Sequence, residues 1–243
     1  MEREGQKERE VELREWFVEK GITYVLFDMD GTLIDTPSHF LTRMHTYCDF
    51  LAQKSGITEN ELFDVFMDGI ISLRDEFNVQ PTVLDVPARV LAKMCGIEGD
   101  ELEKEIDELM SMYETAPEVF PEAVNQVRVV RDAGMDMAVV TQAAEPWTRL
   151  KSKYFPGLFK DYVCTPTDKP KNIEAWMRGM EKIKAIPEEV MIVGDSWTSD
   201  ILPALEMGAK MVVWIRNGED PKNHDGVIEI ETIADLTETL LMN

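Results

Sequence analysis

The sequence predicts an α/β fold in which a doubly wound, mostly parallel sheet carries an inserted, all-helical unit. Strand-like and helical segments alternate over residues 118–243, and such alternation is typical of an open parallel sheet covered by helices. One further strand-like segment, 22–28, is apolar along almost its whole length, as expected of a strand buried on both faces. Residues 36–117, between these two parts, show helical patterns. One sheet interrupted by one helical insertion is the simplest arrangement.

The chain is expected to begin with a charged helix. Its apolar side chains Leu13, Trp16 and Phe17 are placed to pack on the rest of the protein. Gly21 is expected to end this helix, because glycine is favoured where a helix stops. The predicted division is a helical extension at 1–20, a core at 21–35 and 118–243, and a helical insertion at 36–117.

The insertion is predicted to contain helices at 37–54, 58–77, 83–95 and 98–114. In the last of these, Leu102, Ile106 and Leu109 recur at helical spacing, which predicts one apolar face. Prolines such as Pro81 and Pro87 mark breaks and helix starts. These helices are expected to form a small bundle of their own.

The second part of the core alternates regularly. Strands are expected near 136–141, 160–164, 189–194, 210–215 and 227–230, and helices at 121–133, 145–153, 171–184, 198–207 and 232–241. The strand segments DMAVVT, EVMIVG and KMVVWI are rich in β-branched and other apolar residues. Helical crossovers between such strands make the sheet parallel.

Composition argues against several classes of protein. The formal net charge of −22 repels nucleic acid and anionic lipid, so neither is an expected partner. No run approaches the length of about 18 apolar residues that spans a membrane, and no secretory signal is recognisable. The three widely spaced cysteines are expected to be free thiols. We expect a cytoplasmic protein, either a monomer or a homodimer.

Polar side chains gather where the predicted strands end. In doubly wound sheets, ligands bind beyond the carboxyl ends of the strands. The side chains expected there belong to Asp28, Asp30, Thr141, Lys169, Asp195 and Asp200. Adjacent carboxylates repel one another unless they share a cation or a proton. Because all-oxygen ligands suit Mg²⁺, which also contacts phosphates, the pattern predicts a magnesium site that takes a small phosphate ester.

These residue types suit phosphoryl transfer. A carboxylate of ordinary pKa is ionised at neutral pH, so Asp28 needs no base to attack phosphorus. Asp30 lies two residues on, where it is placed to protonate the leaving oxygen and then to activate a water. Thr141 and Lys169 are placed to hold the non-bridging phosphate oxygens, whose charge is neutralised during transfer.

The same motifs resemble those of a known superfamily. DMDGTLID resembles the DxDGTL signature of haloacid-dehalogenase-type phosphatases. VVTQ, Lys169-Pro170 and GDSWTSD resemble the later hydroxyl, lysine and acidic motifs, in the same order. The resemblance covers residues 22–243 and implies a Mg²⁺-dependent hydrolase that forms an aspartyl phosphate.

The resemblance also implies a role for each acidic residue. Asp28 is the nucleophile and a metal ligand. Asp30 is the acid and base, and its backbone carbonyl also ligates the metal. Asp195 is a metal ligand, and Asp200 is expected to act on the metal through water. A simple alternative for Asp200 is a first-turn carboxylate favoured by the helix dipole.

The phosphate-binding residues implied by the resemblance are Thr141, Gln142 and Lys169. Members of the superfamily often have Asn where this chain has Gln142, so only the backbone N–H of Gln142 is carried over as a phosphate contact. Lys171 is a second candidate for the lysine, but the Lys169-Pro170 pairing favours Lys169.

The insertion at 36–117 resembles the helical cap of phosphoglycolate-phosphatase-like members. A cap that closes over a site excludes water and bulky substrates, so the expected substrate is a small phosphorylated metabolite.

Three other functions remain open. A sugar phosphomutase uses the same motifs. A dehalogenase does not need an acid at Asp30, which argues against it. A phospho-accepting regulatory domain has its motifs in a different order, and the helical insertion has no place in it.

Overall fold

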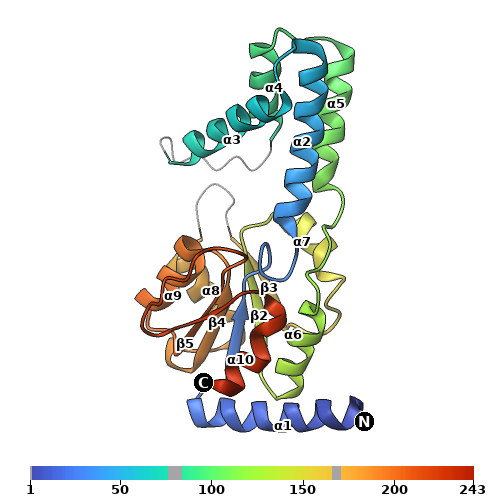
Figure 1. Ribbon diagram of the computed structural model, residues 1–243. Coiled ribbons are helices and arrows are strands. Elements are labelled where there is room, and N and C mark those ends of the chain that lie inside the picture. Colours follow the sequence, from blue (N-terminus) through green and yellow to red (C-terminus); the bar gives the residue numbers. More distant parts are fainter. Residues whose placement is uncertain (1, 76–83, 166–170) are drawn as a thin grey trace. The chain divides into compact units, whose positions relative to one another are not determined.

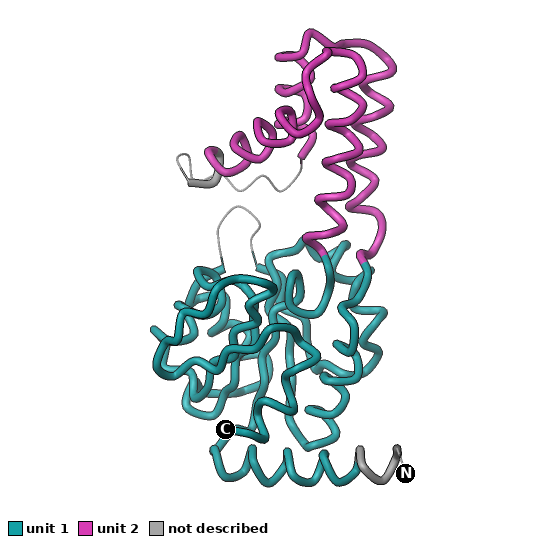
Figure 2. Tube along the Cα trace, viewed as in Figure 1, with its two compact units in different colours: residues 1–35, 118–165, 171–243 teal, residues 36–117, 166–170 magenta. Residues whose placement is uncertain are grey.

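The computed structural model describes residues 2–75, 84–165 and 171–243, and their side chains over 7–72, 84–165 and 171–243. The chain divides into two compact units (Figure 2). Unit 1 contains the described parts of residues 1–35, 118–165 and 171–243, and unit 2 those of 36–117. Each unit has its own apolar core.

Unit 1 is built on a six-stranded sheet (Figure 1). The strands are β1 (Tyr24–Phe27), β2 (Asp136–Thr141), β3 (Asp161–Cys164), β4 (Val190–Gly194), β5 (Met211–Ile215) and β6 (Val227–Ile230). Their order is β3-β2-β1-β4-β5-β6 and every neighbouring pair is parallel. The order of strands along the chain therefore reverses at β1, with β2 and β3 on one side of it and β4, β5 and β6 on the other, and ligands bind at such a switch point.

Helices cover both faces of the sheet (Figure 1). One face packs on α1 (Glu2–Lys20), α6 (Ala123–Asp132) and α10 (Leu236–Met242), and the other on α8 (Ile173–Ile183) and α9 (Leu202–Glu206). In β1, Val25 and Phe27 point into the first layer and Leu26 into the second. Because successive strand residues face opposite sides and both sides are covered, the strand is apolar throughout.

The N-terminal helix α1 is part of unit 1. Leu13 and Phe17 are fully buried in the core, and Trp16 is 8% exposed. Arg14 donates hydrogen bonds to the backbone oxygens of Ala133 and Asp132. The helix therefore adds apolar burial and polar contacts to the core, and it ends at Lys20, before Gly21 with its positive φ of 70°.

Unit 2 is helical over its described residues. It contains α2 (Thr36–Ser55), α3 (Glu59–Asp75), α4 (Asp85–Met94), α5 (Asp100–Met110) and a short 3₁₀ helix (Ser111–Tyr113). Leu102, Ile106 and Leu109 all face the apolar core of this unit, as their spacing predicts. Tyr47 is buried beside them and donates a hydrogen bond to the backbone oxygen of Ala88 at 2.8 Å.

The predicted fold class is confirmed: a parallel sheet covered on both faces, with a helical insertion between β1 and β2. One expected helix, 198–207, instead begins as a π-helix (Trp197–Ile201) that leads into α9. The ends of the expected helices 58–77 and 83–95 fall outside the described residues. Among the helices that the structure describes, none combines the length and apolar character that crossing a membrane requires.

Candidate active site

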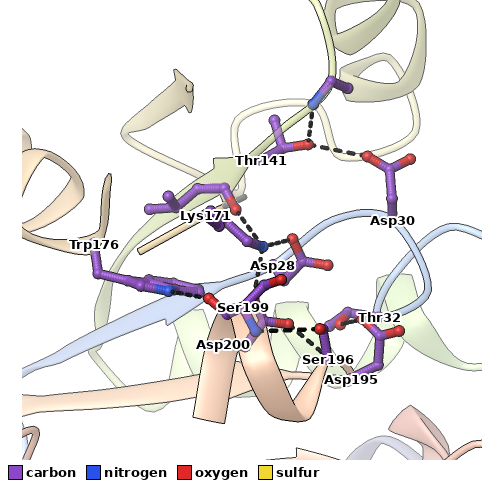
Figure 3. A network of polar contacts seen from close by, with 12 residues as sticks. Asp28, Asp30, Thr32, Thr141, Lys171, Trp176, Asp195, Ser196, Ser199 and Asp200 are labelled. Carbon is purple, nitrogen blue, oxygen red and sulfur yellow. Dashed lines mark hydrogen bonds and ion pairs between the residues drawn. The ribbon is translucent and has the colours of Figure 1, made fainter. Parts of the chain in front are cut away.

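The central strands bring the predicted acidic residues together. Asp28 follows β1 directly, Thr141 ends β2, and Asp195 follows β4. Since β1 lies between β2 and β4 and all three run in parallel, their carboxyl ends meet at the switch point. Figure 3 shows the polar network that results.

Asp28 lies at the centre of this network and is only 4% exposed. Its carboxylate contacts the ammonium group of Lys171, which is also buried. Lys171 Nζ lies 2.7 Å from Asp200 Oδ1 and donates to the backbone oxygen of Val140 at 3.3 Å. One buried cation therefore links two buried carboxylates (Figure 3).

The three carboxylates of Asp28, Asp195 and Asp200 lie close together, and those of Asp28 and Asp200 are buried. Burial raises the pKa of Asp28 well above its usual value; the Lys171 ammonium opposes this, while Asp200, Asp195 and Asp30 add to it. Burial also raises the pKa of Asp195 to about 7, and the nearby Asp200 charge adds to the effect. In the metal-free protein, part of this acidic cluster therefore takes up protons near neutral pH.

The acidic cluster fits a divalent cation. Asp28, Asp195 and Asp200 each offer a carboxylate oxygen, and these three atoms lie within 4.8 Å of one another. Three hard oxygen donors suit Mg²⁺, and a bound cation relieves the mutual repulsion that raises their pKa values. Asp200 offers a carboxylate oxygen to this set as Asp195 does, and the water-mediated role expected for Asp200 stays a prediction.

Gly31 is required at this point of the site. It has a positive φ of 85°, and a Cβ added there would lie 2.3 Å from Asp195 Oδ2. Glycine therefore suits position 31, which combines a positive φ with the close approach of the Asp195 carboxylate. Asn217 Nδ2 donates to the Gly31 oxygen at 2.7 Å, and Thr32 Oγ1 donates to Asp195 Oδ1 at 3.0 Å. These contacts join the loop after β1 to those after β4 and β5.

Asp200 is positioned by the turn that follows β4. The Ser196 N–H donates to Asp200 Oδ2 at 3.0 Å. A Cβ at Gly194 would lie 2.5 Å from the same oxygen, so this glycine leaves room for the carboxylate. The π-helix that begins at Trp197 carries the fully buried Asp200 back to the end of β4.

Asp30 occupies a different environment from Asp28. Its side chain is 24% exposed. Thr141 Oγ1 donates a hydrogen bond to Asp30 Oδ2 at 3.0 Å, and the Lys151 ammonium contacts Oδ1. Asp30 is thus held by a hydroxyl and an ammonium group while it stays part-exposed, which suits a group that exchanges protons with substrate and water.

Two lysines lie at the site in the described part of the chain, Lys171 and Lys151. Lys169 lies outside the described residues. Lys171, the weaker candidate on sequence, is the lysine found at Asp28. Lys151 was not anticipated; the available signal was its spacing of four residues from Trp147, which puts both on the buried face of α7 (Glu145–Ser152). Gln142 follows β2 and is half-buried, and its phosphate contact stays a prediction.

Comparison with known proteins identifies the family of this chain. The model for haloacid dehalogenase-like hydrolases matches residues 22–208. Pyrophosphatase PpaX of Bacillus cereus (strain ATCC 10987 / NRS 248) is 27% identical over 211 residues, which cover 81% of this chain and 86% of that protein.

Two solved structures share the fold. The crystal structure of a HAD phosphatase from Thermococcus onnurineus has a TM-score of 0.64 at 25% identity, covering 90% of this chain and 98% of that one. The putative HAD-hydrolase YfnB from Bacillus subtilis, bound to magnesium, has a TM-score of 0.65 at 20% identity, with coverage of 90% and 98%. The family model spans well over half of the sequence, and the chain belongs to the haloacid dehalogenase-like hydrolases.

Proposed function

We propose that this hydrolase is a Mg²⁺-dependent phosphatase that acts on a small phosphorylated metabolite through an aspartyl-phosphate intermediate. The observation that carries the proposal is the placement of two carboxyl groups with different surroundings. Asp28 is buried against an ammonium group, whereas Asp30 is part-exposed and held by Thr141. A dehalogenase needs the first group and not the second.

In the proposed reaction, an oxygen of Asp28 attacks phosphorus and forms an acyl phosphate. The bond from phosphorus to the ester oxygen breaks, and Asp30 gives that oxygen its proton. Asp30 then takes a proton from a water molecule, which attacks the phosphoryl group and releases inorganic phosphate and Asp28. General acid and base steps of this kind each contribute about 10²- to 10⁴-fold in rate.

The phosphate group is proposed to lie between Lys171 and Thr141. Lys171 already contacts Asp28, so its ammonium is beside the attacked phosphorus and neutralises charge on the non-bridging oxygens. Thr141 is fully buried at the end of β2, with its hydroxyl facing the loop of the first motif. Lys169 remains the alternative to Lys171, and the Gln142 N–H is a further proposed phosphate contact.

The proposed cofactor is Mg²⁺, held by Asp28, Asp195 and Asp200, with the backbone carbonyl of Asp30 as a further ligand by family resemblance. When bound, the ion offsets the charge of the phosphate and of the acidic cluster. Thr32 and Gly31 keep Asp195 in place for this role.

Unit 2 is proposed to act as a helical cap of the phosphoglycolate-phosphatase type, which selects the leaving group. In this scheme the site residues of unit 1 bind the phosphate and the metal, so other parts of the chain must distinguish one substrate from another. The name of the B. cereus relative makes inorganic pyrophosphate a compound to include among the candidates.

A panel of phosphate compounds tests the proposal. Sugar phosphates, phosphoglycolate, pyrophosphate and p-nitrophenyl phosphate are assayed for phosphate release with Mg²⁺ and with EDTA, and 2-chloropropionate for chloride release. We expect Mg²⁺-dependent phosphate release and no chloride release. Sugar isomer formation without phosphate release would indicate a phosphomutase instead. Chloride release alone would contradict the proposal.

A further inference from the structure

Lys151 is a buried charge that the reaction described above does not use. The residue is fully buried on α7. Its ammonium contacts Asp30 Oδ1 and lies 4.0 Å from the centre of the Trp147 ring. Removing an ammonium from water is costly, and replacing a whole buried ion pair by hydrophobic side chains of similar volume is often neutral or stabilising. Core packing alone therefore does not account for a lysine here.

The second contact of Asp30 is less permanent. A threonine hydroxyl has one proton to donate, and the Thr141 hydroxyl donates it to Asp30 Oδ2 at 3.0 Å while accepting from the Ala143 N–H at 3.1 Å. If Thr141 donates to a phosphate oxygen, it no longer donates to Asp30. Binding of substrate therefore removes the Thr141 contact of the Asp30 carboxyl group.

The Lys151 contact is independent of that change. Its ammonium contacts the other carboxylate oxygen, Oδ1, and lies close to the Trp147 ring. With Lys151 on Oδ1, the proton destined for the leaving group belongs on Oδ2, the oxygen that Thr141 vacates.

We propose that Lys151 is a positioning residue that holds the Asp30 carboxyl group in place for proton transfer once the Thr141 hydroxyl has turned to the phosphate. The inference deepens the proposed phosphatase function and rests on it. Lys151 acts through Asp30 and has no contact with the reacting phosphorus in this scheme.

The test compares Lys151→Met, which keeps the length and removes the charge, with Lys160→Met. Lys160 is a matched control, because it pairs with Asp136 on the surface of the same unit. Phospho-enzyme formation is measured in single turnovers with saturating Mg²⁺, using an alkyl phosphate and p-nitrophenyl phosphate. The second substrate has a good leaving group and needs little protonation.

Lys151→Met should slow the first step with the alkyl phosphate on the order of 10- to 10²-fold, a part of what general acid catalysis contributes. The step with p-nitrophenyl phosphate should change much less, Lys151→Arg should recover part of the loss, and Lys160→Met should match the wild type. Equal losses for both substrates, or no loss, would overturn the inference.

A crystal structure of Lys151→Met gives a readout that does not depend on activity. We expect the Asp30 carboxyl group to leave its present position or to occupy more than one. A single, unchanged Asp30 position overturns the inference, even in a protein that hydrolyses phosphate esters. A wild-type protein that hydrolyses none of the panel contradicts the proposed function instead, and the structure still decides whether Lys151 positions Asp30.

Discussion

Lys171 Nζ lies 2.7 Å from Asp200 Oδ1 in a part of the protein where both side chains are buried. The same ammonium contacts Asp28, and the interaction with both carboxylates raises the pKa of Lys171 above its ordinary value although burial alone lowers it. Lys171 therefore remains a cation, fixed beside the proposed nucleophile.

The first prediction separates Lys171 from Lys169. Lys171→Met should lower kcat/KM for phosphate esters by at least about 10²-fold, because the charge that faces the phosphoryl oxygens is lost. In EDTA it should also lower the free energy of unfolding by about 3–5 kcal/mol, the usual effect of removing one partner of a buried ion pair. Lys169→Met is the matched variant and should retain most activity. The opposite ranking in the kinetic assay would restore Lys169 as the phosphate-binding lysine.

Lys171 and Lys169 illustrate which features of the fold and the site can be predicted from the sequence. Periodicity and strand-like runs suffice for the α/β class, because alternation along the chain fixes the layers of a parallel sheet. Asp28 and Asp195 follow strands directly, so their place at the sheet edge could be predicted from the strands alone. Lys171 lies seven residues beyond the end of β3, so the strands alone do not place it at the sheet edge.

Lys151 escaped prediction for a different reason. Its helix is short and mixed in polarity, and which of its faces is buried depends on packing against the sheet and Trp147. The π-helical start before α9 is similarly a tertiary effect, since it brings Asp200 to the end of β4.

The second prediction concerns Asp28. Asp28→Asn should abolish turnover, because an amide is a poor nucleophile, and should leave the fold intact, because Lys171 keeps its contact with Asp200. Circular dichroism and thermal unfolding check the fold. Beryllium fluoride should inhibit the wild type by mimicking the acyl phosphate. Substantial turnover by the folded variant would rule out Asp28 as the nucleophile.

The third prediction is a coupling between pH and Mg²⁺. In the metal-free folded protein the pKa of Asp28 is raised and that of Asp195 is raised to about 7. The ordinary pKa of an aspartate is about 4. Between about pH 4 and about pH 7 the folded protein therefore binds more protons than the unfolded chain. Stability in EDTA should therefore fall as pH rises through this window. Since Mg²⁺ binds the deprotonated carboxylates, it should raise Tm more at about pH 8 than at about pH 6.

Asp195→Asn is the control for this coupling. It removes one titrating ligand, so the fall of stability with pH in EDTA should be shallower and the Mg²⁺-induced rise in Tm smaller. If wild type and variant show the same slope in EDTA, the pKa of Asp195 is not the cause.

The fourth prediction concerns unit 2. Its apolar cluster is separate from those of the core, so replacing residues 38–115 by a short linker should leave a folded core. We expect this shortened protein to keep some hydrolysis of p-nitrophenyl phosphate and to lose discrimination among metabolite esters. A core that preserves the full-length ranking of substrates would show that the insertion does not select them.

The last prediction concerns Asp30. Substrates with different leaving groups distinguish a role as a general acid from a structural role. An alkyl alkoxide is too basic to leave without a proton, whereas p-nitrophenolate leaves readily. Asp30→Asn should therefore slow phospho-enzyme formation by about 10²- to 10⁴-fold with alkyl phosphates, corresponding to about 3–5 kcal/mol of barrier, and much less with p-nitrophenyl phosphate. Steady-state turnover should fall for both substrates, because the same group activates the water in the second step. Single-turnover measurements resolve the two steps. Equal losses in the first step would mean that Asp30 serves only to hold Thr141 and Lys151 in place, and that the acid lies elsewhere.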